Sequence, residues 1–279
     1  MRKITASAAN EIVPGEPLIR FENISIAFEG VPVLSDISFA VDAGETKVVL
    51  GESGSGKTVL LKLAAGLLRP DSGRAIIMGH NLNEMGEVEL LDFRRRIGFV
   101  FQEGALFDSL DVADNVSFRL REERKPPQEC ESRVREALRF VEMEPAYHKF
   151  PSELSGGMRR RVSIARALID HPSVVYYDSP TAGLDPITSQ TIITLILRLR
   201  DLSGATSLLA THRLQDAFGL ANFVFEPDAN RVLPVWEDSD GRHFAPTSVL
   251  VLRAGKIYFE GEIQQLLKSE DSYLRKFLE

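Results

Sequence analysis

Residues 51–58 read GESGSGKT and match the pattern G-x-x-x-x-G-K-[ST] in full. A short, mostly apolar run at 47–50 precedes the match, and apolar residues at helical spacing follow it from 58 to 68. A phosphate-binding loop needs this order of strand, glycine-rich loop and helix, whereas a chance glycine-rich turn does not. The stretch therefore predicts an α/β protein that binds ATP or GTP.

Each residue type in this loop is suited to binding phosphate for a physical reason. Glycines allow the backbone to point successive N–H groups at the phosphates, and the helix N-terminus adds favourable positive potential. The lysine places a cation on the β- and γ-phosphates, and the threonine hydroxyl ligates Mg²⁺. The predicted nucleotide-binding residues here are Gly51, Ser53, Gly54, Ser55, Gly56, Lys57 and Thr58, of which Thr58 is also a predicted metal ligand.

Strands and helices alternate outward from the loop. Apolar patterns predict strands at 18–28, 33–41, 75–78, 97–101, 174–177, 207–210, 223–225 and 249–253. They predict helices at 129–141, 155–169, 187–200, 214–221 and within 263–279. From about residue 105 to 168 the pattern is helical. The sequence therefore predicts an open, mostly parallel sheet interrupted by a helical subdomain.

Composition excludes several classes of protein. The 279-residue chain is 44% hydrophobic and 26% charged, as is usual for a globular protein, and it has no apolar run of bilayer-spanning length. Its net charge of −7 argues against broad nucleic-acid binding. We interpret the arginine runs at 94–96 and 159–161 as solvated helix faces. A single cysteine, Cys130, excludes an intrachain disulfide, and the N-terminus has no secretory signal pattern.

A second set of residues narrows the family, because a phosphate-binding loop alone also occurs in kinases and GTPases. In chain order the set comprises Phe28, the loop, Gln102, the stretch LSGGM at 154–158, VVYYD at 174–178, AGLD at 182–185, and His212. This order resembles the ATP-binding subunits of ABC transporters. The resemblance covers residues 18–265, nearly the whole chain.

The resemblance implies a fold and a domain organisation. The expected fold is a P-loop NTPase of the ABC type. It has a RecA-like, mostly parallel sheet core, an N-terminal antiparallel β-subdomain and an inserted α-helical signature subdomain. A flexible leader is expected at 1–17 and the ATPase domain at 18–265, with the helical subdomain at about 104–170. A polar segment at 226–248 is expected to be a surface insertion, and 266–279 a helical tail.

The resemblance also implies roles for single residues. The signature turn, Ser155, Gly156 and Gly157, caps the γ-phosphate of ATP held by a second copy, so that two copies pair head to tail across the nucleotides. Asp185 belongs to the same nucleotide-contacting set, and Phe28 lies against adenine. Thr58, Gln102 and Asp178 hold Mg²⁺. The implied catalytic residues are Gln102, Asp178, Ser179 and His212.

One subfamily is resembled more closely. The stretches FQEGALF at 101–107, VADNV at 112–116 and LRE at 120–122 are similar to the ATPases of Mla/Mce-type lipid transporters. Met158 within the signature, DPIT at 185–188 and the stretch 274–278 fit the same group. This implies a separate multi-span permease, an Mce-type lipid-binding subunit, phospholipid or another hydrophobic cargo, and a peripheral place on the cytoplasmic face of the inner membrane. Other importers share such short matches.

One position departs from the family pattern. The stretch at 174–178 resembles the Walker B strand, which ends in Asp178. The residue after that aspartate is usually glutamate, and here it is Ser179, which has no base of its own. Loss of a general base typically costs about 10²–10⁴ in rate. Hydrolysis is then slow, or the chain is an ATP-dependent clamp that hydrolyses poorly, or the serine is an engineered substitution. We favour slow hydrolysis, because the other ATP-contacting motifs are intact.

Two other functions remain to be weighed. DNA-repair ATPases of the ABC type carry a very long coiled coil, but about a hundred residues without heptads separate Lys57 from Ser155 here. A soluble ABC-type assembly scaffold stays open, since it needs no permease. Trp236 lies in the 226–248 segment, where we expect it to be buried locally. The cargo is not encoded in this chain, because selectivity belongs to other subunits.

Overall fold

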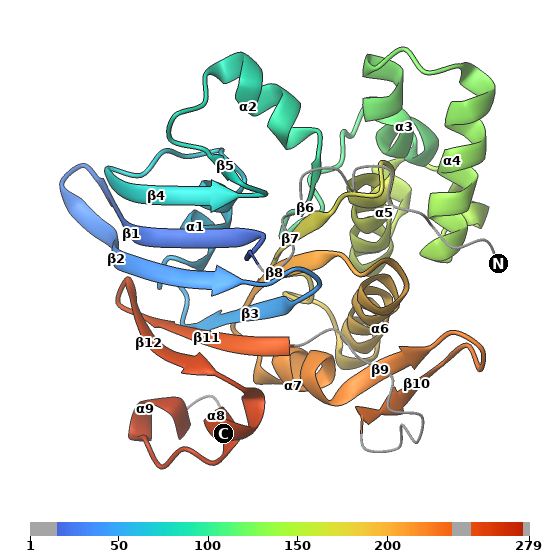
Figure 1. Ribbon diagram of the computed structural model, residues 1–279. Helices are drawn as coiled ribbons and strands as arrows, with labels where there is room; N and C mark the ends of the chain where they lie inside the picture. Colours follow the sequence, from blue (N-terminus) through green and yellow to red (C-terminus); the bar gives the residue numbers. More distant parts are fainter. Residues whose placement is uncertain (1–15, 236–246, 276–279) are drawn as a thin grey trace.

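A computed structural model describes residues 16–235 and 247–275. Its central sheet has the strand order β12-β11-β3-β8-β7-β6 (Figure 1). The parallel strands are β11 (Thr247–Arg253), β3 (Thr46–Gly51), β8 (Thr206–Thr211), β7 (Val174–Asp178) and β6 (Ile97–Val100), and β12 (Lys256–Gly261) pairs antiparallel to β11. Every residue of β3, β7 and β8 is buried, as expected for a sheet covered on both faces.

A second, antiparallel sheet covers one face of the first. Its order is β2-β1-β4-β5, with β2 at Val31–Val41, β1 at Ile19–Phe28, β4 at Ser72–Ile77 and β5 at His80–Asn81. Helix α1 (Lys57–Ala64) packs between the two sheets, and α2 (Glu87–Arg94) packs against β6. Tyr176 of β7 belongs to this core layer, and its hydroxyl donates to the Ala64 carbonyl at 2.9 Å.

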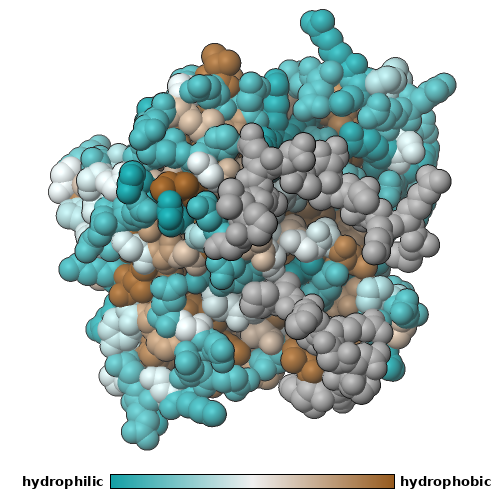
Figure 2. All heavy atoms as spheres, in the orientation of Figure 1, coloured by the Kyte–Doolittle hydropathy of each residue, from teal (hydrophilic) through white to brown (hydrophobic). Residues whose placement is uncertain are grey.

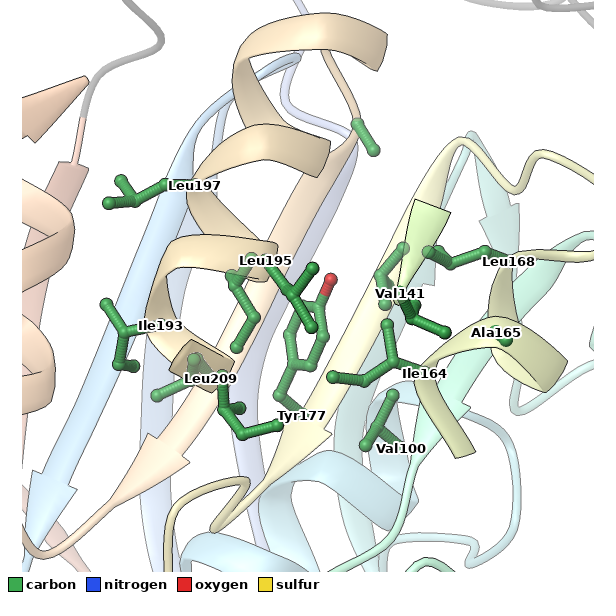
Figure 3. Close-up of a cluster of buried hydrophobic side chains, with 14 of the residues drawn as sticks. Val100, Val141, Ile164, Ala165, Leu168, Tyr177, Ile193, Leu195, Leu197 and Leu209 are labelled. Atoms are coloured by element: carbon green, nitrogen blue, oxygen red, sulfur yellow. The ribbon is translucent and has the colours of Figure 1, made fainter. Parts of the chain in front are cut away.

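Helices cover the opposite face of the central sheet. They are α5 (Gly156–Leu168), α6 (Pro186–Ser203) and α7 (Leu214–Asn222). Figure 3 shows Tyr177 of β7 among side chains of α5 and α6, with Val100 and Leu209 from the neighbouring strands. Tyr176 and Tyr177 thus enter opposite core layers, because successive strand residues point to opposite faces.

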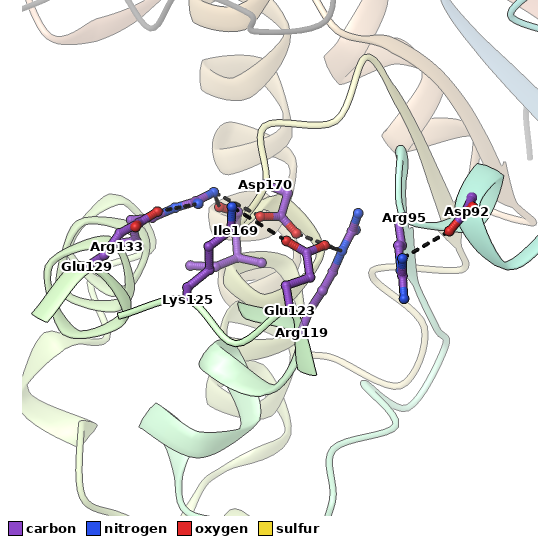
Figure 4. Close-up of polar contacts among 9 residues, drawn as sticks. All are labelled: Asp92, Arg95, Arg119, Glu123, Lys125, Glu129, Arg133, Ile169 and Asp170. Carbon is purple, nitrogen blue, oxygen red and sulfur yellow. Dashed lines mark hydrogen bonds and ion pairs between the residues drawn. The ribbon is translucent and has the colours of Figure 1, made fainter. Parts of the chain in front are cut away.

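Three helices form the helical subdomain: α3 (Val112–Glu122), α4 (Pro127–Phe140) and α5. Figure 4 shows Asp170, just after α5, between two arginines of the other helices. Its carboxylate lies 2.7 Å from Arg119 Nε on α3 and 2.9 Å from Arg133 on α4. Short 3-10 turns at Glu144–Ala146 and Pro151–Glu153 lead from α4 to α5. The ion pairs fix the three helices at one end of the subdomain.

The expected architecture agrees with this arrangement, but four elements were not predicted: α2, β5, β10 (Arg231–Pro234) and β12. The segment 226–248 was predicted to be a surface insertion, without any strand, and the structure shows a hairpin at its start, formed by β9 (Phe223–Glu226) and β10. Val232 packs against the core and holds that hairpin. Residues 1–15 of the expected leader, 236–246 of the insertion with Trp236, and 276–279 of the tail lie outside the described residues.

Two short helices end the described chain, α8 (Ile263–Leu267) and α9 (Ser272–Arg275), and both bury apolar side chains. In the described ranges, no helix combines the length and apolarity needed to cross a bilayer. Figure 2, in the orientation of Figure 1, shows a mostly hydrophilic surface with hydrophobic side chains in small separate spots.

Candidate nucleotide-binding site

The phosphate loop, residues 51–58, joins the buried end of β3 to the start of α1. Gly54 and Gly56 have φ of 80° and 101°, in the left-handed region that favours glycine. A Cβ on Gly56 would also lie 2.5 Å from the Leu34 side chain of β2. Glycine is therefore required at 56 by both backbone conformation and space, as expected where a loop must curve tightly before a helix.

Lys57 is held inside its own loop. Its ammonium donates to the carbonyl oxygens of Gly51 at 2.7 Å and Glu52 at 2.8 Å, and the residue is only 9% exposed. Burial lowers the pKa of Lys57, and the nearby carboxylate of Asp178 partly opposes that shift. The loop thus concentrates one poorly solvated cation at the N-terminus of α1, where an anion also gains from the helix dipole.

Thr58 and Asp178 meet beside this cation. The Thr58 hydroxyl donates to Asp178 Oδ1 at 3.1 Å, and the Ser179 hydroxyl donates to the same oxygen at 3.3 Å. Asp178 ends β7, a strand separated from β3 only by β8, so the sheet brings the two segments together. A hydroxyl and a carboxylate oxygen side by side are the hard donors that Mg²⁺ prefers.

Ser179 is fixed chiefly by its backbone. Its N–H donates to the Ala210 carbonyl of β8 at 2.8 Å, and its own carbonyl accepts from Ala182 at 3.1 Å. Its φ is 48°, a left-handed conformation that is uncommon for a residue other than glycine. The side chain is nearly buried and adds only a hydroxyl, so no carboxylate stands at this position.

Gln102 and His212 lie at the same edge of the sheet. Gln102 comes two residues after β6 and His212 directly after β8, and both side chains are exposed. The parallel register pairs Val100 with Tyr177 and Asp178 with Ala210, which places these loops on either side of Asp178. In the described part of the chain, neither side chain makes a hydrogen bond or ion pair. The structure thus brings them to the same edge as Asp178, without a hydrogen bond to Thr58 or Asp178 among the described residues.

The signature turn lies on another part of the surface. Ser155 caps α5, its hydroxyl accepting from Met158 N at 3.3 Å, and both Ser155 and Gly156 are exposed. Gly157 packs on α6 so closely that a Cβ there would lie 2.4 Å from Thr188. The turn therefore packs on the start of α6, and among the described residues no hydrogen bond or ion pair joins it to the phosphate loop of its own chain.

Asp185 begins α6 next to that turn. Its carboxylate accepts from Thr188 N at 3.0 Å, and hydrogen bonds from the Thr188 side chain and backbone lower the pKa of Asp185. The carboxylate is thus committed to capping its helix. Ser155, Gly156 and Asp185 form one exposed surface at the starts of two helices.

Phe28 stands at the end of β1, 44% exposed. The following strand, β2, contributes Leu34, whose side chain reaches Gly56 of the phosphate loop. The hairpin of β1 and β2 therefore borders the loop through Leu34, and β1 ends in an accessible aromatic ring.

Arg160 was misinterpreted from the sequence. The run at 159–161 was expected to be a solvated face, yet Arg160 is 5% exposed and its guanidinium donates to the carbonyls of Phe101 at 2.7 Å and Ala182 at 3.4 Å. Arg159 is exposed, as expected, because only one position of such a run faces inward on a helix. Arg160 thus connects α5 with the loops that carry Gln102 and Asp185.

A groove of about 530 Å³ lies beside this connection. It is lined by Glu103, Leu106 and Asp108 from one side, and by Gly156, Arg159 and Leu184 among others from the other side. Phe107, which lies between two of the lining residues, and Phe118 of α3 are both exposed, and their ring centroids are 4.8 Å apart. The groove offers both charged and apolar groups to a partner.

Comparison with known proteins agrees with this geometry. The family model described as "ABC transporter" matches residues 34–182. The chain is 36% identical to a methionine import ATP-binding protein MetN of Mesorhizobium japonicum, over 79% of this chain and 61% of that one. It is 38% identical to a probable ribonucleotide transport ATP-binding protein mkl of Mycobacterium tuberculosis, over 75% and 59%. The chain thus spans about 60% of the length of these relatives.

Another relative matches over nearly its whole length. The chain is 31% identical to the intermembrane phospholipid transport system ATP-binding protein MlaF of Haemophilus influenzae, over 94% of this chain and 90% of that one. Among solved structures, the dimeric post-hydrolysis state of the ATP-binding cassette MJ0796 bound to ADP and Pi superposes with a TM-score of 0.74 at 26% identity, covering 88% and 98% of the two chains. The expected fold class is therefore confirmed. The chain belongs to the ABC transporter family, and its described fold is that of the family's ATPase domain.

Proposed function

We propose that this chain is the ATP-binding subunit of a transporter, and that it binds ATP with Mg²⁺ at the phosphate loop. The observation that carries the proposal is the convergence of the Lys57 ammonium with the oxygens of Thr58 and Asp178. Thr58 and Asp178 would hold Mg²⁺, with Gln102 as a third ligand. The bound ion would neutralise charge on the phosphates. Phe28 would lie against adenine.

The chain's own residues then orient the reaction. Lys57 would exchange its carbonyl partners for phosphate oxygens, a stronger charge-assisted contact. Gln102 and His212, exposed on either side of Asp178, would orient the attacking water. Ser179 cannot take up a proton as glutamate would, so we propose real but slow hydrolysis. This fits a reaction that depends mainly on positioning and electrostatics.

A second copy of the chain is the proposed nucleotide-dependent partner. The exposed surface of Ser155, Gly156 and Asp185 has unused N–H groups at the start of α5, which suits a phosphate. MJ0796, which shares the fold, forms a dimer. The signature turn of one copy would thus cap the γ-phosphate of ATP bound to the other copy.

We propose a membrane permease as the second partner and phospholipid, or another hydrophobic molecule, as its cargo. The exposed rings of Phe107 and Phe118, whose centroids lie 4.8 Å apart, stand next to Leu106 and Asp108 on one side of the groove and suit a helix with apolar and charged side chains. The lipid assignment is supported by MlaF, since this chain spans 90% of MlaF but 61% of MetN. An Mce-type lipid-binding subunit and a peripheral position on the cytoplasmic face of the inner membrane belong to the same proposal. The net charge of −7 disfavours nucleic acid as a partner.

The first prediction concerns Lys57. Lys57→Met should weaken ATP binding about tenfold to a hundredfold, because it removes a charge-assisted contact worth roughly 1.5–3 kcal/mol. Fluorescent ATP titration measures this effect. Lys62→Met, a partly buried change on the same helix, is the matched control and should bind as the parent does. Equal affinity of the Lys57 variant and the parent would contradict the site.

The second prediction concerns Ser179. Ser179→Glu should raise the turnover of ATP at least about tenfold, because it supplies the missing carboxylate. Ser179→Gln is the control of similar size without a base, and it should not gain activity. Phosphate release at saturating Mg-ATP measures both. Equal turnover in the parent and the glutamate variant would remove the account of slow hydrolysis.

The third prediction concerns the second copy. With Mg-ATP the chain should shift from monomer to dimer in light scattering, most clearly in Ser179→Gln. Ser155→Arg should abolish the shift, because it blocks the signature turn while leaving the phosphate loop intact. Ser152→Arg, also exposed and three residues away, should dimerise normally. A dimer that forms equally in the Ser155 variant would disprove this interface.

The fourth prediction concerns the permease. The chain should purify from detergent together with a multi-span membrane protein, and Phe107→Asp combined with Phe118→Asp should release it. The control is Val88→Asp, an exposed apolar residue on α2. Phospholipid in the purified complex would support the proposed cargo. Purification within a wholly soluble complex would instead favour an assembly scaffold.

A further inference from the structure

Asp216 of α7 is a buried carboxylate shared by two loops. It is 2% exposed, and its Oδ2 accepts hydrogen bonds from the hydroxyls of Thr181 and Thr211, both at 2.6 Å. Thr181 follows Ser179 by two residues, and Thr211 directly precedes His212. A single oxygen therefore joins the segment after the Walker B strand to the segment that carries the exposed histidine.

Arg213 makes a second connection between the same segments. Its backbone N–H donates to the Thr211 hydroxyl at 3.0 Å, and its guanidinium donates to Ser189 Oγ at 2.8 Å and to the Thr181 carbonyl at 3.4 Å. The guanidinium also lies 3.9 Å from Asp216 Oδ1. The residues on both sides of His212 are thus anchored, while the imidazole itself is left exposed.

Such a network fixes the positions of the loops that it joins, because its hydrogen bonds are short, directional and shielded from water. A buried carboxylate is costly unless it is hydrogen-bonded, so the two hydroxyl donors hold their positions firmly. Positioning matters more here than in a chain with a general base, since Ser179 supplies none. A displacement of about 1 Å at a reacting group can cost about a hundredfold in rate.

We propose that Asp216 is a positioning residue for ATP hydrolysis, which fixes the His212 segment against the segment that follows Ser179. The inference rests on the proposed function, because it concerns the rate of that reaction. Asp216 acts through Thr181 and Thr211, and it does not itself touch the nucleotide.

The test is a double-mutant cycle between Asp216→Asn and His212→Ala. Asparagine keeps the shape but removes the charge. Alone it should lower kcat by about tenfold to a hundredfold, with KM for ATP nearly unchanged. In the His212→Ala chain it should have little further effect, because the group that it positions is already gone. Equal fold losses in both backgrounds would mean a merely structural role and would overturn the proposal.

Further variants separate positioning from stability. Thr211→Val should lower kcat as Asp216→Asn does. Thr211→Ser, which keeps the hydroxyl, should turn over ATP as fast as the parent. Asp201→Asn is the matched control, because Asp201 is a buried carboxylate that instead binds Arg200 and the Phe225 N–H. It should lower the melting temperature without lowering kcat. A kcat loss in the Asp201 variant equal to that of Asp216→Asn would contradict the inference.

The series is repeated in the Ser179→Glu chain, which is expected to turn over faster. If neither chain hydrolyses ATP, both the proposed hydrolysis and the role of Asp216 are wrong. If ATP is hydrolysed but Asp216→Asn turns over as fast as its parent, only the role of Asp216 fails.

Discussion

A carboxylate held at the buried end of a parallel strand is the constraint around which the site is arranged. Asp178 is 5% exposed at the end of β7, where all residues are buried, so its charge must find partners within the protein. Thr58 and Ser179 supply hydroxyl donors, and the charge of Asp178 acts on Lys57 strongly enough to raise the pKa of its ammonium against the effect of burial. These contacts link α1 to β7 across β8. The phosphate loop is therefore positioned by the core of the sheet, and a change in strand order would dismantle it.

The same burial prepares the loop for an anion. Lys57 loses solvation, and its present partners are neutral carbonyls, which stabilise an ammonium less than a charged oxygen does. The pKa of Lys57 is lowered for that reason. A phosphate at the N-terminus of α1 would therefore relieve an unfavourable burial as well as add contacts. This explains how a chain with a net negative charge can still attract a triphosphate at one point.

Local patterns predicted those parts of the molecule that local chemistry determines. The phosphate loop, the buried strand before Asp178 and the start of α5 near Ser155 each follow from residue types at fixed spacing. Helix α2 was missed because it buries only Leu90 and Phe93, too few apolar positions to show a helical period, and these two join a core built by other elements. The inward face of Arg160 depends likewise on carbonyls of other loops. The same is true of Asp216, which lies 35 residues from Thr181 in the sequence but bonds to it.

Position 179 shows why a motif predicts a fold better than a rate. Its backbone is held by the Ala210 carbonyl and the Ala182 N–H, so the conformation of the loop depends mainly on backbone hydrogen bonds. The side chain adds chemistry but little structure, since its one hydrogen bond is to the neighbouring Asp178. Fold and proton transfer are therefore separable here. In the proposed hydrolysis no carboxylate stands at position 179, so control over the rate would pass to groups that only orient water. The rigidity of the loop bearing His212 would then contribute to catalysis.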